Sequence, residues 1–241
     1  MIRKTLYPLI PFFAFLLLIS CNGNGQPADT IAATPEDLRV KENQLIESYL
    51  KNAVTDSGKT GDSLVHLYNA ALLKSFYESG KYNVCWSNGQ QWMPEADSVF
   101  QLIKDGRFLG LYPEEYHFTI LDSIRDRIQA DSLGKSDRKD ARWWAVADLL
   151  LTDALGRIIS DVKLGRLPQD SISMRKDSVL TDSFIMARIR VVKEKGLTSM
   201  IRALEPSARG YQSLKAAIPG FLSGADFSKT YTRVPYPEKD V

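Results

Sequence analysis

The sequence predicts an all-α protein, an irregular multi-helix bundle built around one long central helix. Apolar residues recur with a helical period over most of the stretch between residues 136 and 168. The remaining segments begin at residues that cap helices and end at glycines or polar breaks. No repeat of fixed period appears, so a solenoid is not expected. A hydrophobic fraction of 44% with 25% charged residues is enough for a chain of this length to bury a core.

The central helix is predicted to begin at Ser136 or Asp137, whose side chains can cap an N terminus, and to end at Gly165. In its first half Val146 and Leu149 make the second side apolar too, so we expect other helices to cover it from several directions. One wide face is apolar and consists of Ala147, Leu150, Leu151, Ala154, Leu155, Ile158, Ile159 and Val162. The opposite face is mostly polar and consists of Thr152, Asp153, Gly156, Arg157, Ser160 and Lys163.

Six further helices are predicted from caps, breaks and periodicity, and a seventh is predicted to be capped by Thr119. Thr34 followed by Pro35 is a typical helix start, whereas Gly80 and Gly196 are typical ends. The six cover residues 34–53, 63–79, 94–104, 182–195, 197–204 and 211–222. Residues 105–117 are expected to form a compact loop, and 169–181 a polar loop.

Residues 1–20 have the composition of an export signal. Arg3 and Lys4 precede an apolar run that is short for a membrane span and is interrupted by two prolines. The run ends in Leu-Ile-Ser-Cys, which resembles a bacterial lipoprotein signal in which Cys21 becomes the lipid-modified N terminus. The alternative is an uncleaved membrane anchor with an incidental cysteine. Residues 21–33 are then expected to be a lipid-anchored tether.

The expected location is the bacterial cell envelope, with the chain facing the periplasm from the outer membrane. Several acyl chains on Cys21 would hold the protein to the lipid membrane. The residues after Cys21, Asn-Gly-Asn-Gly-Gln, lack an acidic run resembling signals for surface export. Of the 31 basic residues, two lie in the signal; the remaining 29 equal the 29 acidic residues, so charge gives no reason to expect a nucleic-acid partner.

The chain offers few residues for catalysis. Its two histidines and two cysteines form no metal-ligand pattern, so we expect no metal and no cofactor. His117 is expected to fix a loop or cap a helix rather than to act as a base. Cys85 is expected to be buried and reduced, and the four tryptophans are expected to pack in the core rather than to bind sugar.

Several residues are predicted to be structurally important. Asp148 and Asp153 place polar groups at the border or on the far side of an apolar helix, and Asp153 is four residues before Arg157, the spacing of a helical ion pair. Gly156 lies inside the predicted helix, which suggests a close neighbour. Tyr116, next to His117, completes this group.

Four segments in order resemble the helical scaffold domain of the large periplasmic L,D-transpeptidases, which cross-link peptidoglycan. The segments are FYESGKYNVCW, DGRFLGLYPEEYH, DLLLTDALGR followed by Gly165-Arg166, and YQSLKAAI. The resemblance spans roughly Leu64 to Leu222, inside a predicted domain of residues 34–223. It implies that the loop residues Gly165 and Arg166 belong to the scaffold.

The family's catalytic residues cannot be transferred to this chain. In the family a separate β-rich domain carries a Ser-His-Gly-Cys nucleophile motif, and neither Cys21 nor Cys85 stands in such a motif. We therefore expect no enzyme activity from these residues. The expected function is a non-catalytic, lipid-anchored periplasmic scaffold with peptidoglycan or a cell-wall enzyme as its partner.

Three alternatives remain open at this point. The chain could be the front of an L,D-transpeptidase whose catalytic domain lies beyond residue 241, with residues 224–241 as an extended tail or linker. It could be a hydrolase or transferase that uses acidic residues near Tyr112 to His117. It could also be a lipoprotein that binds a small molecule or cell-wall material.

Overall fold

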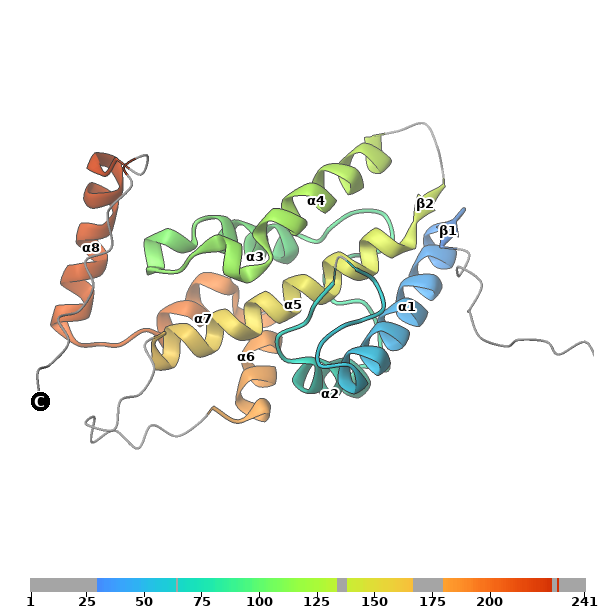
Figure 1. The fold of residues 1–241 in the computed structure, drawn as a ribbon, viewed down its shortest axis with the longest axis horizontal. Helices are drawn as coiled ribbons and strands as arrows, with labels where there is room; N and C mark the ends of the chain where they lie inside the picture. The colour runs from blue at the N-terminus through green and yellow to red at the C-terminus, as the bar shows by residue number, and fades with distance from the viewer. Residues whose placement is uncertain (1–29, 64, 134–137, 167–179, 227–228, 230–241) are drawn as a thin grey trace, which may run out of the picture.

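A computed structural model describes residues 30–63, 65–133, 138–166, 180–226 and 229. This part of the chain is mostly helical, with eight α-helices, two short 3-10 helices and one pair of two-residue strands (Figure 1). The all-α prediction is therefore confirmed. The predicted signal peptide, Cys21 and most of the tether lie outside the described residues, as do most of the 169–181 loop and most of the tail.

The elements follow one another with short connections. In chain order they are β1 (Ile31–Ala32), α1 (Pro35–Thr55), α2 (Ala70–Ser79), α3 (Pro94–Lys104), η1 (Gly106–Leu109), η2 (Pro113–Tyr116), α4 (Phe118–Leu133), β2 (Lys139–Asp140), α5 (Ala141–Leu164), α6 (Asp182–Lys195), α7 (Leu197–Leu204) and α8 (Arg209–Gly224). The two strands are antiparallel, with Ile31 opposite Asp140.

Helix α5 is the central helix of the bundle (Figure 1). It contacts α1, α2, α3, α4, α6, α7 and η2. Because helices surround it, residues assigned to its polar face are buried as well, among them Thr152, Asp153 and Gly156. Its first turn is partly accessible at Arg142 and Trp143, and its last turns become accessible again, with Lys163 exposed.

The predicted start of this helix was wrong. Helix α5 begins at Ala141, and its cap is Asp140, whose side chain accepts from Arg142 N at 3.0 Å. The backbone is extended up to Asp140 because Lys139 and Asp140 pair with β1. Ser136 and Asp137 lie outside the described residues.

The second predicted helix begins later than expected, at Ala70, where Asn69 caps it by accepting from Leu72 N. The preceding residues form a loop that folds back, in which Leu67 N donates to Gly58 O at 2.9 Å. Gly58 has φ of +93°, and a Cβ there would lie 2.3 Å from Leu67 O, so the close approach requires glycine. His66, expected on the helix, lies exposed in this loop.

Most other predicted helices match the structure. The bounds of α3, α6 and α7 are those predicted, and α1 and α8 differ from the prediction by two residues at one or both ends. Helix α4 begins one residue before Thr119, which therefore is not its cap. Two of the four tryptophans, Trp86 and Trp144, are fully buried in the core, and the other two pack against it.

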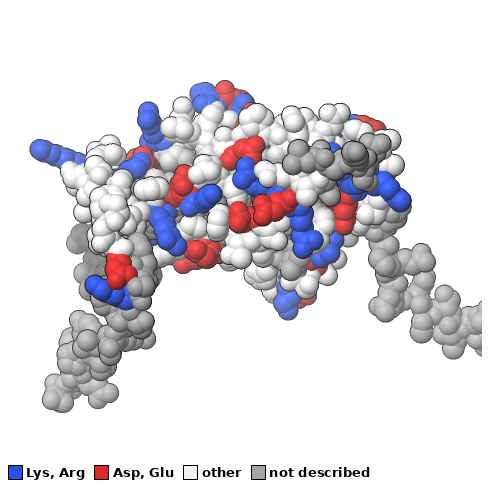
Figure 2. All heavy atoms as spheres, turned by 90° about the horizontal axis from the view of Figure 1, so that it is seen from above, with Lys and Arg blue, Asp and Glu red and all other residues white. Residues whose placement is uncertain are grey.

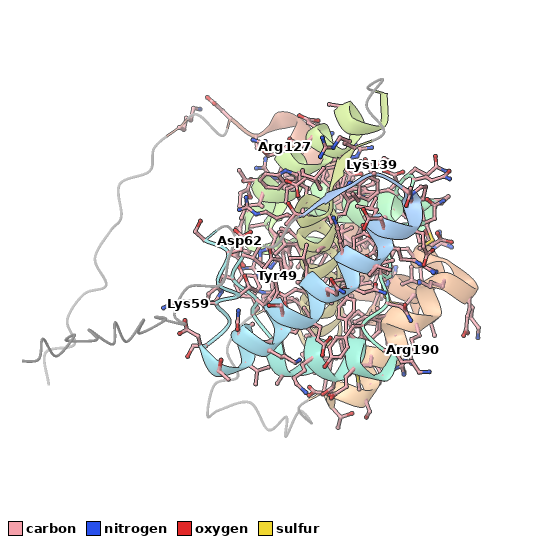
Figure 3. All side chains as sticks on the ribbon, turned by 90° about the vertical axis from the view of Figure 1, so that its right-hand side faces the viewer. Tyr49, Lys59, Asp62, Arg127, Lys139 and Arg190 are labelled. Carbon is pink, nitrogen blue, oxygen red and sulfur yellow. The ribbon has the colours of Figure 1, made fainter. Side chains whose placement is uncertain are left out.

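An ion pair fixes the loop after α1 to the start of α5. The carboxylate of Asp62 accepts two hydrogen bonds from the Arg142 guanidinium, at 2.6 and 2.9 Å. The Tyr49 hydroxyl donates weakly to the same carboxylate at 3.5 Å, and Tyr49 and Asp62 lie close together in Figure 3. A bidentate guanidinium–carboxylate pair constrains orientation as well as distance. The fold-back loop is therefore oriented relative to the central helix.

Helix α8 differs from the others because none of its residues is buried. It stands at one end of the bundle, where it contacts η1 and leaves Leu214 and Phe221 exposed (Figure 1). Glu205 holds its first turns through Tyr211 and Lys215. Within the described residues no helix is both long and apolar enough to span a bilayer. On the face drawn in Figure 2, basic and acidic side chains are interspersed.

Gly156 is not required by close packing, contrary to the sequence-based prediction. A Cβ at this position would lie 3.6 Å from Ile185 Cγ2 and 3.9 Å from Leu72 Cδ2, which are ordinary contacts. Gly156→Ala should therefore raise the free energy of unfolding by about 0.5–1 kcal/mol, the usual gain in a helix interior. Urea denaturation followed by circular dichroism measures this.

Gly165→Ala is the matched comparison. Gly165 has φ of +83° at the end of α5, and no atom of the described residues lies within 4 Å of the position a Cβ would take, so only backbone strain opposes alanine. This variant should lose about 1–3 kcal/mol, because φ of +83° with ψ of 163° is a backbone conformation that essentially only glycine adopts. A loss of stability in Gly156→Ala of similar size would contradict the contact geometry.

Candidate functional site

Three buried polar residues, Asp148, Thr152 and Asp153, lie on α5 and form the centres of two groups, whose aspartates are one to two helical turns apart. The first, here the Asp148 cluster, comprises Asp148, Thr152, Tyr77, Cys85 and Trp86. Asp148 is 2% exposed and accepts from the backbone N–H groups of Cys85, at 2.9 Å, and Trp86, at 2.8 Å. The Tyr77 hydroxyl donates to the same carboxylate at 2.5 Å. One buried side chain thus satisfies two backbone donors of the loop after α2.

Thr152 extends this cluster by one helical turn. Its hydroxyl donates to Asp148 O at 2.9 Å and accepts from Trp86 Nε1 at 2.8 Å. The Tyr77 hydroxyl oxygen lies 2.6 Å from Thr152 Oγ1. Tyr77 and Trp86 are each 1% exposed, so these bonds form without water access from outside the protein. Cys85 and Trp86 are therefore fixed to α5 by both backbone and side-chain bonds.

Burial sets the ionisation of this cluster. It raises the pKa of Asp148 to about 6, although the bonds from Tyr77 and the two N–H groups favour the charged form. Burial, with the nearby Asp148 charge, raises the pKa of the Cys85 thiol to about 12. The thiol therefore stays protonated near neutral pH and is a poor nucleophile. Cys85 is a free cysteine. It was expected to be buried, but it is only partly buried.

The second group, here the Asp153 cluster, joins Asp153 to His117, Tyr68 and Asn69. Asp153 is 2% exposed, and its carboxylate accepts from Tyr68 N at 2.8 Å and Asn69 N at 3.2 Å. His117 Nε2 lies 2.8 Å from Asp153 Oδ2 and donates to it, because the carboxylate only accepts. The His117 ring also stacks on Tyr68, with centroids 4.8 Å apart. His117 has the loop-fixing role that its position predicted.

The predicted ion pair between Asp153 and Arg157 does not form. The Asp153 carboxylate is occupied by the loop, and Arg157 instead bonds to Glu115, with its guanidinium nitrogens 3.2 Å from the carbonyl and 3.4 Å from the carboxylate. Arg157 also lies over the Tyr68 ring, 4.3 Å from its centroid. The residue therefore ties two loops together at the surface, where its charge is partly exposed.

The remaining predicted residues surround this network. Arg166 pairs with the Glu115 carboxylate. Tyr116 is buried, and its hydroxyl donates to Asp161 Oδ2 at 2.7 Å. Gly165 terminates α5. Gly156 lies in α5 opposite Ile185, without a polar role. The structure thus brings Asp153, Arg157, Arg166, Tyr116 and His117 into one region, and it places Asp148 in the other cluster.

Glu42 was missed by the sequence analysis. It is fully buried on α1, with Oε1 3.4 Å from the Ser87 hydroxyl and with no hydrogen-bond partner for Oε2 among the described residues. Burial, and next the Asp148 charge, raises its pKa to about 8. The signal was available, because Glu42 occupies one step of the four-residue spacing that carries the buried Leu38 and Ile46.

These groups suit structural roles better than catalysis. Both aspartates have their acceptor positions occupied by donors from loops, and both are shielded from solvent. Near Tyr112 to His117, Glu115 is engaged by two arginines and Glu114 lies 3.7 Å from Arg107. Within the described residues, no three metal-binding side chains lie together as a metal site would require.

Removing the Asp148 carboxylate should destabilise the protein strongly. Asp148→Ala leaves the backbone N–H groups of Cys85 and Trp86 without their acceptor, while the Tyr77 hydroxyl keeps the backbone O at position 148, so the loss should be about 3 kcal/mol or more. Tyr77→Phe keeps both backbone bonds and should cost about 1 kcal/mol. Urea denaturation compares them, with the exposed Asp122→Ala as control. Equal losses for Asp148→Ala and Tyr77→Phe would mean that the backbone bonds contribute little.

Glu42 should make stability depend on pH. Its pKa is about 8 in the folded protein, against an ordinary 4.5, so between these values the unfolded chain loses a proton that the folded chain keeps. Stability must therefore fall as pH rises through this window. Glu42→Gln should remove this loss, so that the variant gains on the order of a few kcal/mol over wild type between pH 5 and 9.

Urea denaturation at pH 5 and pH 9 tests this, with Glu47→Gln on the same helix as control. Glu47 is partly exposed and pairs with Lys51 at the surface. A Glu42→Gln variant whose stability parallels that of wild type across the pH range would show that Glu42 is ionised in the folded protein.

Comparison with known proteins gives one match. A family model described as "Scaffold domain" matches residues 71–218, from the first turn of α2 into α8. No curated protein and no solved structure matches the chain. The matched region contains the whole Asp148 cluster and, except for Tyr68 and Asn69, the Asp153 cluster. Because the match covers more than half of the 241 residues, the chain belongs to the Scaffold domain family.

Proposed function

We propose that this protein is a non-catalytic, lipid-anchored scaffold of the cell envelope that holds an enzyme of peptidoglycan cross-linking in position. The enzyme class comes from the resemblance of four segments to the scaffold domain of L,D-transpeptidases. The family match supports the scaffold part of the proposal. The lipoprotein-like signal that ends at Cys21 supports the anchor and the periplasm-facing location.

The single observation that carries the proposal is that the two buried aspartates of α5 hold loops in place. Asp148 and Asp153 accept backbone N–H groups from two separate loops, so the polar chemistry of the core is used to hold a shape. An enzyme would instead leave a carboxylate or histidine free to bond to a substrate. Asp153 lines a hollow of about 240 Å³, but its oxygens already accept from Tyr68 N, Asn69 N and His117. His117, the buried histidine, is bonded to Asp153 and stacked on Tyr68.

Cys21→Ser should release the protein from membranes, because it removes the thiol that carries the acyl chains. In cells, wild-type protein should sediment with membranes and incorporate labelled palmitate, whereas the variant should do neither. Asn22→Ser, one residue further along, is the control and should behave as wild type. If the serine variant remains in the membrane fraction, the anchor lies elsewhere.

Partner binding is tested separately. The purified mature protein is mixed with isolated peptidoglycan and, in a second experiment, with purified L,D-transpeptidases from the same cell. Retention of an L,D-transpeptidase is the expected result; retention on peptidoglycan alone would indicate a wall-binding module instead. Incubation with muropeptides should leave their chromatogram unchanged, and the appearance of new species would contradict the non-catalytic assignment.

A further inference from the structure

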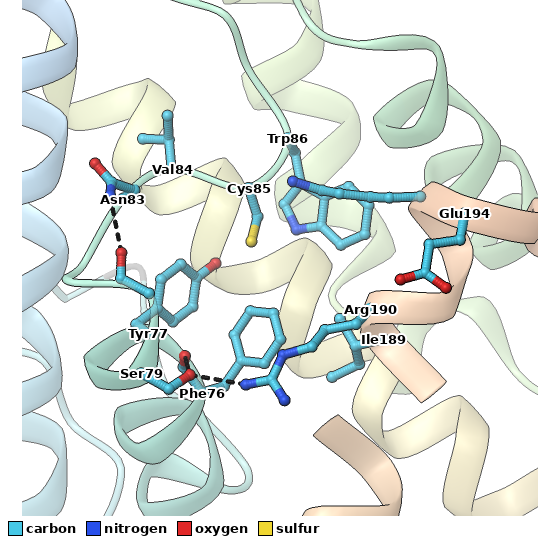
Figure 4. A pocket seen from close by; sticks show the side chains of 12 residues that line it. Phe76, Tyr77, Ser79, Asn83, Val84, Cys85, Trp86, Ile189, Arg190 and Glu194 are labelled. Atoms are coloured by element: carbon cyan, nitrogen blue, oxygen red, sulfur yellow. Dashed lines mark hydrogen bonds between the residues drawn. The ribbon is translucent and has the colours of Figure 1, made fainter. Parts of the chain in front are cut away.

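A hollow between α2 and α6 borders the Asp148 cluster, whose Tyr77, Cys85 and Trp86 form part of its wall. It has a volume of about 510 Å³ and is lined by residues of α2, the 80–86 loop and α6 (Figure 4). We call it the α2–α6 pocket. Pockets that bind small organic molecules typically measure about 300–1,000 Å³. The volume therefore suits a small molecule rather than a protein segment.

One side of the pocket is apolar and rigid. Phe76, Trp86 and Ile189 line it, and all three are largely or fully buried. Trp86 cannot turn away, because its indole N–H is bonded to Thr152 and its backbone N–H to Asp148. The protonated Cys85 thiol adds to the same wall. These surfaces offer a preformed contact for an aromatic or branched apolar group.

The other side carries two cations that form no ion pair with the described residues. Arg190 extends across the pocket from α6 to Ser79, whose hydroxyl accepts from it at 2.8 Å, and its guanidinium lies 5.7 Å from the Phe76 ring centroid (Figure 4). That bond uses one of the five guanidinium N–H donors. Lys193 makes no ion pair or hydrogen bond with the described residues, yet its charge reaches Asp148 and Cys85 inside the pocket wall.

The charges of the residues that line the pocket indicate the charge of its ligand. On the lining itself Arg190 and Lys193 outnumber the one acid, Glu194, so the pocket surface has an excess of one positive charge. That excess matches one negative charge on a ligand. The Asp148 carboxylate lies behind the wall, where its oxygens accept from Tyr77, Cys85 and Trp86. Arg190 is already held in place through Ser79, and a preorganised guanidinium binds a carboxylate through paired N–H bonds.

We propose that the α2–α6 pocket binds a small monocarboxylate with an apolar body, the carboxylate on Arg190 and Lys193 and the body against Phe76, Trp86 and Ile189. The site adjoins the Asp148 cluster, but Arg190 and Lys193 belong to neither cluster, so substituting them leaves the contacts proposed for the scaffold role intact. A ligand there would contact both α2 and α6, and so would stabilise the packing of these two helices.

The probe is 4-phenylbutyrate, with the uncharged 4-phenylbutyramide as its matched control, and isothermal titration calorimetry measures binding to the mature protein. We expect the carboxylate to bind at least about tenfold more tightly than the amide. The double variant Arg190→Gln, Lys193→Gln should bind the carboxylate at least about tenfold more weakly than wild type does. The double variant should leave the weak amide binding unchanged, since the apolar wall remains intact.

Arg188→Gln is the control for charge on the same helix. Arg188 lies over Phe184 and does not line the pocket, so this variant should bind the carboxylate as wild type does. All three substituted side chains are at the protein surface or partly accessible, and thermal denaturation confirms that the variants fold. Equal affinity for the two probes, an unaffected double variant, or no binding of 4-phenylbutyrate in the millimolar range would each overturn the proposal.

Discussion

The fold depends on backbone N–H groups of two loops being satisfied by carboxylates on one helix. Helix α5 is enclosed on all sides over most of its length, so the loops that cover it cannot satisfy their inward-facing donors with water. Asp148 and Asp153 supply the acceptors. Burying an acid is unfavourable, and the raised pKa of Asp148 reflects this cost even after its donors have partly offset it. These bonds make the placement of the loops specific, because each loop has one place on α5 where a carboxylate accepts its N–H groups.

The two clusters also explain why the connections between helices are irregular. The loop before α2 must reach Asp153, and the loop after α2 must reach Asp148, so α2 itself is placed between two fixed points on the same helix. The loop from η1 through η2 is placed in the same way by His117 and by the Arg157–Glu115 pair. Polar bonds thus determine the path of the chain where hydrophobic packing alone would permit several paths.

Much of the fold could be predicted because its helices have strong local signals. Pro94, Thr181 and Gly196 mark helix bounds by cap chemistry that does not depend on the rest of the chain. The start of α2 could not be predicted in this way, since the apolar Val65 and Leu67 continue the helical spacing but belong to the fold-back loop. The start of α5 depends on strand pairing with residues more than 100 positions earlier, which local reasoning does not detect.

The candidate site was predicted in part for the same reason. Polar residues on an apolar helix identified Asp148 and Asp153, but their partners Tyr77, Trp86 and Tyr68 come from distant segments and carry no signal of their own. The expected Asp153–Arg157 pair followed a local spacing rule that tertiary bonds override. The α2–α6 pocket likewise exists only after α6 has packed against the loop that Asp148 holds.

The length and position of α5 determine how far apart the two ends of the bundle lie. Strand β1 lies beside the start of α5, and α8 stands beyond its far end (Figure 1). The 24 residues of α5 extend over about 36 Å at the usual helical rise. Were residues 21–33 to tether the N-terminal side to a lipid surface, the length of α5 would add to the span of the tether and would place the exposed Leu214 and Phe221 of α8 farther from that surface. The length of α5 would then contribute to the distance between the membrane and a partner that binds α8.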